Sequence, residues 1–425
     1  MVVRQRSFTG LCAVSAVTTI LAFAGCLILA SSLPFADQAV AGAKTSPKRS
    51  DTGLAMTRQI LRYDSMSFHD LPGWQEDDHL AAFEAFRKSC VRVLKSVKSG
   101  HSSKKKSPDP GLLSACFHAS ELAKTNPDRT VAKTFFETHF KPHRINHSGR
   151  EGLLTGYYEP VINGSRTKTA KFSAPIYRRP TVGMTAAVRS NSSTALPTRQ
   201  QIETGALKNK KLELLYLESD VDVFFLQVQG SGRVRLQDGT KIRVTYDGKN
   251  GHPYSSIGQY LIDTKLFPAH RMSLEALSDW LKSDKKRGQR VMWQNKSYVF
   301  FREIKSQKDE GPLGVMQIPL SAGRSLAVDG GYHAIGTPVY VSSPKLRHAT
   351  GDKGFHRLMI AQDVGSAIKG PERGDIYFGS GPRAGKVAGV TKHPGTYYVM
   401  LPAMTGGNVI VAGETSPRPV RQARR

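Results

Sequence analysis

The stretch RGDIYFGSGPRAGKVAG, Arg373 to Gly389, combines a strand-like run with a glycine-rich segment that contains a Gly-Lys pair. A phosphate-binding P-loop requires another glycine upstream of that pair and a Ser or Thr after it, but Ser380 and Val387 occupy these positions. A dinucleotide-binding fingerprint must open a helix, and Pro382 with the β-branched residues beyond it predicts that no helix forms here. The glycines therefore do not indicate a nucleotide site, and Asp375 becomes the candidate functional group.

Asp375 is one of three aspartates that stand among glycines at the ends of strand-like runs, together with Asp329 and Asp363. Any single one of them is adequately explained as a turn residue that accepts hydrogen bonds from nearby backbone amides. Because the same setting occurs three times in a strongly basic chain, the group indicates a functional cluster of acids.

From about Gly152 onward the chain consists of short β-rich runs separated by glycine and proline, which is typical of an all-β barrel or sandwich. The run DVFFLQVQGSGRVRL is predicted to be part of this β structure. A helical interruption follows, because Ser256 begins a capping-box pattern and the segment from Leu274 to Lys282 is amphipathic. The sequence therefore predicts a mainly β body.

Three helices are predicted before this β region. The first follows the aspartate pair Asp77-Asp78, the second begins at Asp109-Pro110, and the third begins at Asn126-Pro127. Antiparallel packing of the first two would bring Cys90 and Cys116 within range of a disulfide bond. Two buried free thiols are the alternative, and export of the chain favours the disulfide.

The N-terminus predicts export. Two arginines precede an uncharged run from Ser7 to Ala36, so residues 1–43 are expected to be a signal peptide or an N-terminal membrane anchor. FAGC resembles a lipoprotein cleavage box, and AVAGA offers small residues for ordinary cleavage. The formal charge of +27 predicts a polyanionic partner, and export argues for an anionic envelope surface rather than nucleic acid. The protein is expected in the periplasm, associated with the outer or the inner membrane.

Other catalytic and metal-binding patterns are missing from the sequence. No Gly-x-Ser-x-Gly or His-Glu-x-x-His motif occurs. His139, His143 and His147 recur at helical spacing, but Pro142 and the basic flank favour a solvated cluster over a zinc site. No metal or cofactor is therefore expected.

Two groups of motifs carry a resemblance to a known family. The segments LLTGYYEPVINGSR, APIYRRP and FFLQVQGSGRVRLQDGTKIRVTYDGKNGHPYSSIGQYLID occur in this order and are followed by YVFFRE and GPLGV. The segments DGGYHAIGTPVYV and AQDVGSAIKGPERGDIYFGSGPRAGKVAG come after them. The first group resembles the specific insert domain of the membrane-bound lytic murein transglycosylase A (MltA) family, and the second resembles that family's C-terminal three-aspartate domain. The resemblance runs from about Gly152 to Pro402.

The resemblance implies a mainly β fold with N-terminal helices, in which a double-psi β-barrel and an inserted second β domain enclose a cleft. The catalytic barrel with its helical lead-in is expected to comprise residues 66–157 and 305–425, and the MltA-specific insert residues 158–304. Residues 44–65 are expected to be a linker.

The implied activity is that of a peptidoglycan lytic exotransglycosylase, a lyase that cleaves the bond between N-acetylmuramic acid (MurNAc) and N-acetylglucosamine (GlcNAc). The sugar's own C6 hydroxyl attacks, so the product has a 1,6-anhydro end and one carboxyl can serve first as acid and then as base. Asp375 matches the family's catalytic position, Asp363 has a supporting role, and Asp329 is structural. Asp375 needs a raised pKa, from burial or from Asp363. The connection GPERG between these two acids is slightly longer than in the family pattern.

Several residues of the insert region are expected to bind glycan. Tyr157 and Tyr158 offer flat faces for stacking on sugars, with ordinary strand packing as the alternative. Gln227 and Gln229 alternate with apolar residues, so they are predicted to share one face of a strand. The remaining predicted contacts are Gly230, Ser231 and Ser256, and helix capping explains Ser256 equally well.

Two other functions are compatible with these residues. One is a hydrolase on the same barrel that uses Asp363 and Asp375 as an acid/base pair. The other is a non-catalytic module that the basic charge holds on the cell wall. The residues themselves leave open whether cleavage occurs within strands or from their ends, whether the chain is lipidated, and which oligomeric state it adopts.

Overall fold

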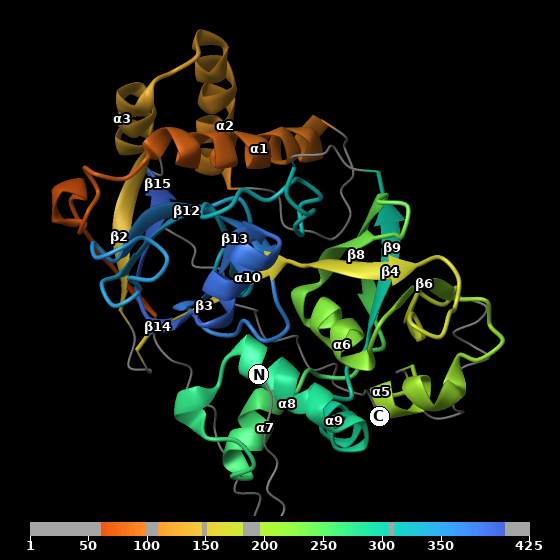
Figure 1. Cartoon of the computed structure of the whole chain (residues 1–425). Helices are drawn as coiled ribbons and strands as arrows, with labels where there is room; N and C mark the ends of the chain where they lie inside the picture. Colours follow the sequence, from red (N-terminus) through yellow and green to blue (C-terminus); the bar gives the residue numbers. More distant parts are fainter. Residues whose placement is uncertain (1–60, 99–108, 147–150, 182–195, 306–309, 404–425) are drawn as a thin grey trace, which may run out of the picture. The chain divides into compact units, whose positions relative to one another are not determined.

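The fold is described from a computed structural model, which covers residues 61–98, 109–146, 151–181, 196–305 and 310–403 (Figure 1). All of these residues belong to one compact unit of the chain, Arg58–Arg425. The predicted signal or anchor segment, 1–43, lies outside the described residues. None of the helices in the described part of the chain is long and apolar enough to span a bilayer.

Strands from both ends of the described chain form a nine-stranded mixed sheet, with the order β1-β2-β15-β11-β12-β10-β13-β3-β14. Its strands are β1 (Arg62–Ser65), β2 (Phe140–Asn146), β3 (Leu153–Glu159), β10 (Ser325–Val328), β11 (Pro338–Ser343), β12 (Phe355–Val364), β13 (Arg373–Ser380), β14 (Lys392–Pro394) and β15 (Thr396–Pro402). The pairs β10·β12 and β13·β3 are parallel, and the others are antiparallel.

The intervening chain forms a second, six-stranded sheet with the order β5-β6-β4-β7-β8-β9. Its strands are β4 (Val161–Ser165), β5 (Ala174–Tyr177), β6 (Glu213–Leu217), β7 (Ser231–Arg235), β8 (Lys241–Lys249) and β9 (Val299–Ile304). The chain leaves the first sheet after Glu159 and re-enters it at Ser325. Within the described residues each sheet has two edge strands, so neither closes on itself. The architecture is therefore mainly β with additional helices.

The helices are distributed around these two sheets. They are α1 (His79–Lys98), α2 (Pro110–Leu122), α3 (Arg129–His139), α5 (Arg199–Gln201), α6 (Asp220–Gln229), α7 (Ile257–Asp263), α8 (Leu274–Ser283), α9 (Lys285–Met292) and α10 (Pro382–Gly389). Single turns occur at η1 (Phe68–Asp70), η2 (Ala123–Thr125), η3 (Ile202–Ala206) and η4 (Ala269–Arg271). Capping fixes the start of α2, where Asp109 accepts a hydrogen bond from Leu112 and Pro110 takes the first helical position. The third helix starts later than predicted, because Asp128 rather than Asn126 is its N-cap.

Two predicted conformations are wrong. The run DVFFLQVQ, expected in a strand, forms helix α6. Ser219 caps this helix, and Gly230, with φ 78°, ends it in the left-handed conformation. The helix is buried on several sides, since Val221, Val223, Phe224 and Leu226 all lie in the core. An apolar pattern on all sides of a helix imitates a buried strand.

The second wrong prediction concerns the segment after Gly381, which was expected not to be helical. It forms α10, because Pro382 occupies the first helical position, where its missing N–H costs nothing. Gly385 allows the helix to approach β3 closely, since a Cβ there would lie 2.8 Å from the ring of Tyr158. The small residues that appeared to oppose a helix are the ones that let it pack against the sheet.

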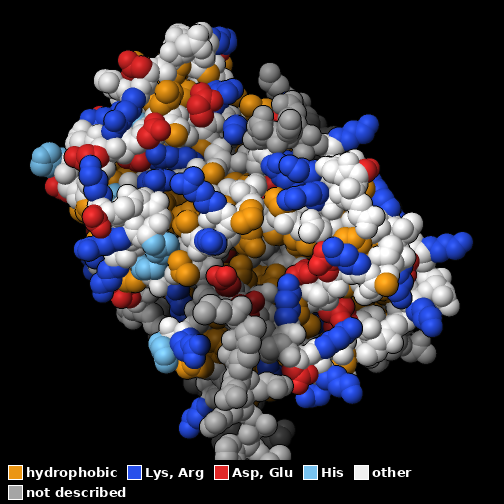
Figure 2. All heavy atoms as spheres, viewed as in Figure 1, with side chains coloured by type: hydrophobic (Ala, Val, Ile, Leu, Met, Phe, Trp, Pro, Cys, Tyr) orange, Lys and Arg blue, Asp and Glu red, His pale blue; other side chains and the backbone are white. Residues whose placement is uncertain are grey.

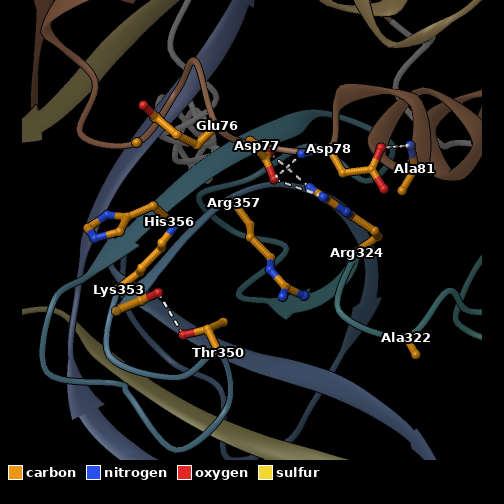
Figure 3. A pocket seen from close by; sticks show the side chains of 12 residues that line it. Glu76, Asp77, Asp78, Ala81, Ala322, Arg324, Thr350, Lys353, His356 and Arg357 are labelled. Atoms are coloured by element: carbon orange, nitrogen blue, oxygen red, sulfur yellow. Dashed lines mark hydrogen bonds and ion pairs between the residues drawn. The ribbon is translucent and has the colours of Figure 1, made fainter.

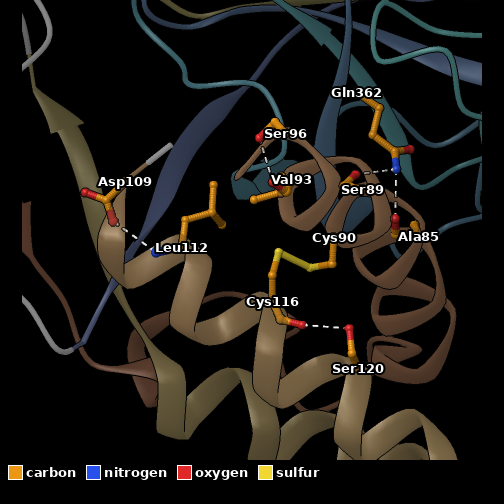
Figure 4. The surroundings of a disulfide bond; sticks show 10 residues. All are labelled: Ala85, Ser89, Cys90, Val93, Ser96, Asp109, Leu112, Cys116, Ser120 and Gln362. Atoms are coloured by element: carbon orange, nitrogen blue, oxygen red, sulfur yellow. Dashed lines mark hydrogen bonds between the residues drawn. A yellow bond between two sulfur atoms is a disulfide. The ribbon is translucent and has the colours of Figure 1, made fainter. Parts of the chain in front are cut away.

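The helices α1 to α3 cover one side of the first sheet and enclose an aromatic-rich core that includes Trp74, Phe86 and Phe136. Within this core Cys90 of α1 and Cys116 of α2 form a disulfide bond, with their Cα atoms 4.9 Å apart (Figure 4). The two helices are in contact, but Figure 1 shows α2 running across α1 and not antiparallel to it as predicted. The disulfide links the helical layer internally, on the side of the sheet that also carries Gln362 (Figure 4).

Replacing both cysteines with alanine should lower the free energy of unfolding by about 3 kcal/mol, because the bond closes a loop of 26 residues in the unfolded chain. Urea unfolding of the oxidised protein and of the double variant measures this difference. Reduction of the unaltered protein should reproduce it. A difference below about 1 kcal/mol would show that the bond does not constrain the unfolded state as the loop length predicts.

Candidate active site

The two central acids flank one strand of the first sheet. Ala327 of β10 pairs with Asp375 of β13 on one side and with Asp363 of β12 on the other. Directly paired residues of neighbouring strands project from the same face, so both carboxyls lie on one face of the sheet. Their backbones are two strand spacings apart, about 10 Å, and Ala327 lies on the strand between them.

A β-bulge brings Asp363 to that face. Leu326 pairs with Ala361, whereas the next residue, Ala327, pairs with Asp363, so Gln362 is an extra residue in β12. Without this extra residue the strict alternation of side chains would turn Asp363 to the opposite face. The bulged Gln362 is fully buried, and its amide donates to the carbonyl of Ala85 and to the hydroxyl of Ser89 in α1. The helical layer therefore fixes the position of the second acid.

Asp375 is partly buried and has one side-chain hydrogen-bond donor among the described residues, Thr155 on the neighbouring strand β3, at 2.6 Å. Burial raises the pKa of Asp375, while the hydrogen bond from Thr155 and the charge of Arg373 oppose this rise. Burial is the largest of these effects, so the protonated carboxyl is favoured relative to an exposed aspartate. Such a carboxyl can donate a proton.

Asp363 is held by more donors than Asp375. The hydroxyl of Tyr157 donates to it at 3.0 Å, and the backbone amides of Val315 and Val364 also donate to it. Burial raises the pKa of Asp363 to about 6, although these three donors oppose the rise and the charge of Asp375 adds a little to it. The many donors fix the orientation of this carboxylate, which suits a supporting group better than a mobile proton donor.

Asp329 lies at a turn, as the simplest interpretation of its sequence predicted. It accepts hydrogen bonds from the amides of Gly331 and Gly370, and Lys369 lies 3.6 Å away. Gly370 belongs to the connection between β12 and β13, so Asp329 ties down the loop that joins Asp363 to Asp375.

The two sheets meet at a buried ion cluster. Glu159, the last residue of β3, is fully buried and pairs with Arg233 of β7 at 2.8 Å and with Arg243 of β8 at 2.6 Å. The hydroxyl of Ser380, at the end of β13, also donates to Glu159. One carboxylate therefore joins the strand that carries Asp375 to two strands of the second sheet.

A cavity of about 450 Å³ lies beside this cluster. Its lining includes Arg233 from the second sheet, Tyr377 and Gly379 from β13, and Lys88 from α1. Tyr377 follows Asp375 by two residues on the same face of β13, and its ring lies 5.4 Å from that of Tyr157. The cavity therefore opens next to the acidic face where the two sheets meet.

The predicted tyrosines both lie near this site. Tyr157 is buried and its hydroxyl is bonded to Asp363, so it positions the acid and does not present a free ring. Tyr158 packs against Gly385 of α10, and its backbone amide donates to Gln229 at 3.0 Å. The alternative of ordinary packing therefore describes the ring of Tyr157, while Tyr158 stays partly exposed.

The two glutamines do not share a strand face, because they lie in α6. Gln227 is buried, accepts a hydrogen bond from Arg199 and donates to the carbonyl of Val299, so its amide is already used within the second sheet. Gln229 faces the junction and accepts from Tyr158. Residues two apart on a helix point in nearly opposite directions, which is the reason for the difference.

The other predicted contacts have clear local roles. Gly230 ends α6, Ser231 is buried at the start of β7, and Ser256 accepts from the amide of Gln259 as the N-cap of α7. Tyr254, just before this cap, also bonds to Ser256. Burial raises the pKa of Tyr254, and the nearby charge of Asp375 adds to this rise. The segment from Tyr254 to Ser256 therefore reaches toward the acids from the second sheet.

Sequence reasoning missed four residues that shape the site: Thr155, Glu159, Arg233 and Arg243. A weak signal existed for Glu159, which is a lone acid at the end of an apolar, aromatic strand. Thr155 carried no signal, since its importance depends on the parallel pairing of β3 with β13, which places it directly beside Asp375.

A dinucleotide fingerprint was set aside partly because no helix was expected after the glycine-rich stretch, but α10 does form there. The surrounding topology therefore has to be compared with that of a dinucleotide-binding unit. That fingerprint belongs to a unit in which the strands before and after the helix are parallel. Here β14, the strand after α10, is antiparallel to β3, and β3 is parallel to β13. The topology around α10 therefore differs from that of a dinucleotide-binding unit.

The histidines of the predicted solvated cluster that the structure describes lie in different secondary-structure elements. His139 ends α3, where it stacks on His118 at 4.8 Å, and His143 lies in β2. His147 lies outside the described residues. In the described part of the chain no group of three or more potential ligands is placed to hold a metal ion.

Two protein-family models match the chain. The MltA specific insert domain matches residues 153–302, and the 3D domain matches residues 324–401. Membrane-bound lytic murein transglycosylase A of Escherichia coli (strain K12) is 38% identical over 260 residues, which are 60% of this chain and 67% of that protein.

Solved structures give the same relationship. The crystal structure of a membrane-bound lytic murein transglycosylase from Agrobacterium tumefaciens is similar with a TM-score of 0.69 at 35% identity, covering 80% of this chain and 97% of that one. Escherichia coli MltA with bound chitohexaose is similar with a TM-score of 0.60 at 28% identity, covering 80% of this chain and 94% of that one. The order of the two matched domains, the paired acids beside β10 and these relatives together establish that the chain belongs to the membrane-bound lytic murein transglycosylase A family.

Proposed function

We propose that this protein is a lytic transglycosylase that cleaves the MurNAc–GlcNAc bond of peptidoglycan and leaves 1,6-anhydro-MurNAc ends. The observation that carries this proposal is the partly buried Asp375, whose pKa is raised and whose one side-chain donor in the described chain is Thr155. The family relationship supports the same reaction, and the chitohexaose bound by the Escherichia coli relative makes a β-linked glycan the natural ligand class.

Asp375 first donates its proton to the glycosidic oxygen, so the bond to the leaving sugar breaks. The resulting carboxylate then takes the proton of the C6 hydroxyl of the same MurNAc, and the C6 oxygen attacks C1 and closes the anhydro ring. The proton count balances without water, and Asp375 ends the cycle protonated. Asp363, fixed by Tyr157 and two backbone amides, orients the sugar or stabilises positive charge that develops at C1.

The sheet arrangement supports an assignment of domains. The nine-stranded sheet takes strands from both sides of the insert and contains two parallel pairs, which supports a single β domain built from 66–157 and 305–425. Because β1 and β14 are unpaired edges among the described residues, closure of this sheet into a double-psi β-barrel stays a prediction. The six-stranded sheet supports the insert at 158–304. The cavity beside Glu159 supports a glycan cleft where the sheets meet.

The envelope is the proposed location. Lys and Arg side chains are spread over the face seen in Figure 2, in keeping with the net charge of +27. This charge favours association with an anionic surface of the cell envelope. Such a location suits an exported, membrane-associated protein whose substrate is the glycan strand.

Mass spectrometry of the products tests the reaction. Digestion of purified peptidoglycan should release muropeptides that are lighter by one water than the products of hydrolysis. A hydrolase that used Asp363 and Asp375 as a pair would release reducing ends instead, and the raised pKa of Asp363 makes this the second candidate. A wall-binding module would pellet with peptidoglycan and release no soluble product.

A further inference from the structure

A second cavity is larger than the one beside the Glu159 cluster. A cavity of about 720 Å³ lies between the start of α1 and the loop before β12 (Figure 3). Asp77, Arg324 and Arg357 are among the residues that line it. Neither the reaction mechanism nor the packing of the core explains why this cavity is so large and so polar.

One ion pair in the cavity is complete in itself. Arg324 forms two hydrogen bonds to Asp77, at 2.9 and 2.8 Å, and the backbone amide of Leu358 also donates to Asp77. Both side chains are almost fully buried, so their charges are mutually neutralised and available to no ligand.

Arg357 differs from Arg324. Its side chain extends from β12 into the cavity (Figure 3), and no described residue accepts a hydrogen bond from its guanidinium. It stacks over the ring of Phe355 at 5.1 Å, and one of its nitrogens lies against Gly323, where a side chain would collide with it. A guanidinium that is held in place and partly buried, with its donors unused, is suited to bind a carboxylate.

Apart from Arg324, which is paired with Asp77, the basic and acidic side chains of the cavity lie on different sides of it. Lys353 lies on the same side as Arg357, whereas Glu76 and Asp78 lie on the other side, at the start of α1 (Figure 3). Among the described residues Glu76 has no ion-pair partner, and Asp78 caps α1 through the amide of Ala81. A ligand with a carboxylate at one end and an ammonium group at the other matches this separation.

The cavity adjoins the candidate active site. Ala322 lines both this cavity and the one beside the acids. The amide of Gly323 donates to the carbonyl of Tyr377 at 2.7 Å, and Tyr377 lies two residues, about 7 Å, beyond Asp375 along β13. A few residues of extended peptide, at about 3.3 Å each, span the remaining separation.

We propose that this cavity binds the peptide stem of peptidoglycan, a short chain that carries both carboxylate and ammonium groups, while the glycan lies against Asp375. The proposal rests on the proposed function, since the stem reaches the cavity only when its MurNAc is near the acids. Arg357 and Lys353 take a carboxylate of the stem. Glu76 and Asp78 face its ammonium group.

The test compares two substrates: glycan strands that carry their stems, and the same strands after an amidase has removed the stems. Arg357→Ala should lower kcat/KM for the strands that carry stems about tenfold relative to kcat/KM for the strands without stems. The reason is that one charge-assisted contact to the stem is lost. Arg290→Ala, an exposed arginine of α9 that lines neither cavity, should leave the ratio unchanged. An unchanged ratio in Arg357→Ala overturns the proposal.

A binding measurement keeps this test independent of catalysis. Isothermal titration calorimetry with the free stem peptide should give saturable binding to the unaltered protein, weaker binding to Arg357→Ala, and weaker binding to Lys353→Ala, whose side chain is exposed. Glu76→Gln should weaken binding of the free peptide but not of its N-acetylated form. Failure of the peptide to bind, or binding of inorganic phosphate in its place, overturns the proposal. Failure to cleave either strand overturns the proposed function instead.

Discussion

Replacing Asp375 with asparagine should lower kcat on purified peptidoglycan about a thousandfold. The substitution keeps the size and shape of the side chain, so Thr155 can still donate its hydrogen bond from 2.6 Å. It removes the proton that the leaving sugar needs and the base that the C6 hydroxyl needs, and general acid–base catalysis typically contributes 10²- to 10⁴-fold. Release of soluble anhydro-muropeptides over time, quantified by mass spectrometry, measures the effect.

The control for this substitution is Asp352→Asn, an exposed aspartate that lies outside both cavities. Its rate should equal that of the unaltered protein.

Burial raises the pKa of Asp375, which means that the ionised carboxyl opposes folding at neutral pH. The Asp375→Asn variant should therefore melt at or above the temperature of the unaltered protein. Retention of more than a tenth of the activity by a folded Asp375→Asn variant would exclude this residue as the acid.

The pH profile gives the assignment a second, independent readout. Asp375 must begin the cycle protonated, so activity should fall as the pH rises through its raised pKa. The hydrogen bond from Thr155 stabilises the ionised form and lowers this pKa. Thr155→Val should therefore move the alkaline limb of the profile to higher pH. A limb that stays in place would mean that another group controls it.

Replacing Glu159 with glutamine should lower the free energy of unfolding by about 3 kcal/mol or more. Glu159 is fully buried, and Arg243 is only 4% exposed in its side chain. Removing the negative charge takes this counterion away from the guanidinium of Arg243, which is almost fully buried. Breaking a buried ion pair in this way typically costs 3 to 5 kcal/mol. Urea denaturation of both proteins at one pH measures the difference.

Glu303→Gln is the matched control, because its partner Arg166 is 49% exposed and the pair lies on the surface of the same β insert. Solvent screens such a pair, so its loss should cost less than about 1 kcal/mol. If both substitutions lowered the free energy of unfolding equally, the buried cluster at Glu159 would contribute no more to stability than a surface ion pair. Since Glu159 joins β3 and β13 to β7 and β8, its loss should also lower activity by loosening the second sheet against the acids.

Several features could be predicted from the sequence because local patterns encode them. The order of the motifs indicates the family, and the glycine-rich surroundings of Asp375 and Asp363 mark these residues as candidate acids. Helix caps and apolar spacing placed Cys90 and Cys116 on neighbouring helices, and the structure joins them in a disulfide. Such signals involve residues close together in the chain, so they can be read without the fold.

Local patterns also misled in two places. In α6 the alternation of valine and glutamine imitates a strand, and the difference depends on Ser219 and Gly230, which cap a helix buried among other elements. In α10 the small residues lower the intrinsic preference for a helix, but they allow close packing on β3. Tertiary packing outweighs local propensity in both segments.

The sequence by itself determined the family and the mainly β character, and it singled out Asp375 and Asp363 as candidate acids. Only the tertiary structure decided how these acids are arranged and what surrounds them. The bulge at Gln362 turns Asp363 toward Asp375, and the parallel pairing of β3 with β13 places Thr155 beside Asp375. The physical reason is strand register: a shift of one residue moves a side chain to the other face of a sheet. Contacts between residues more than two hundred positions apart set that register.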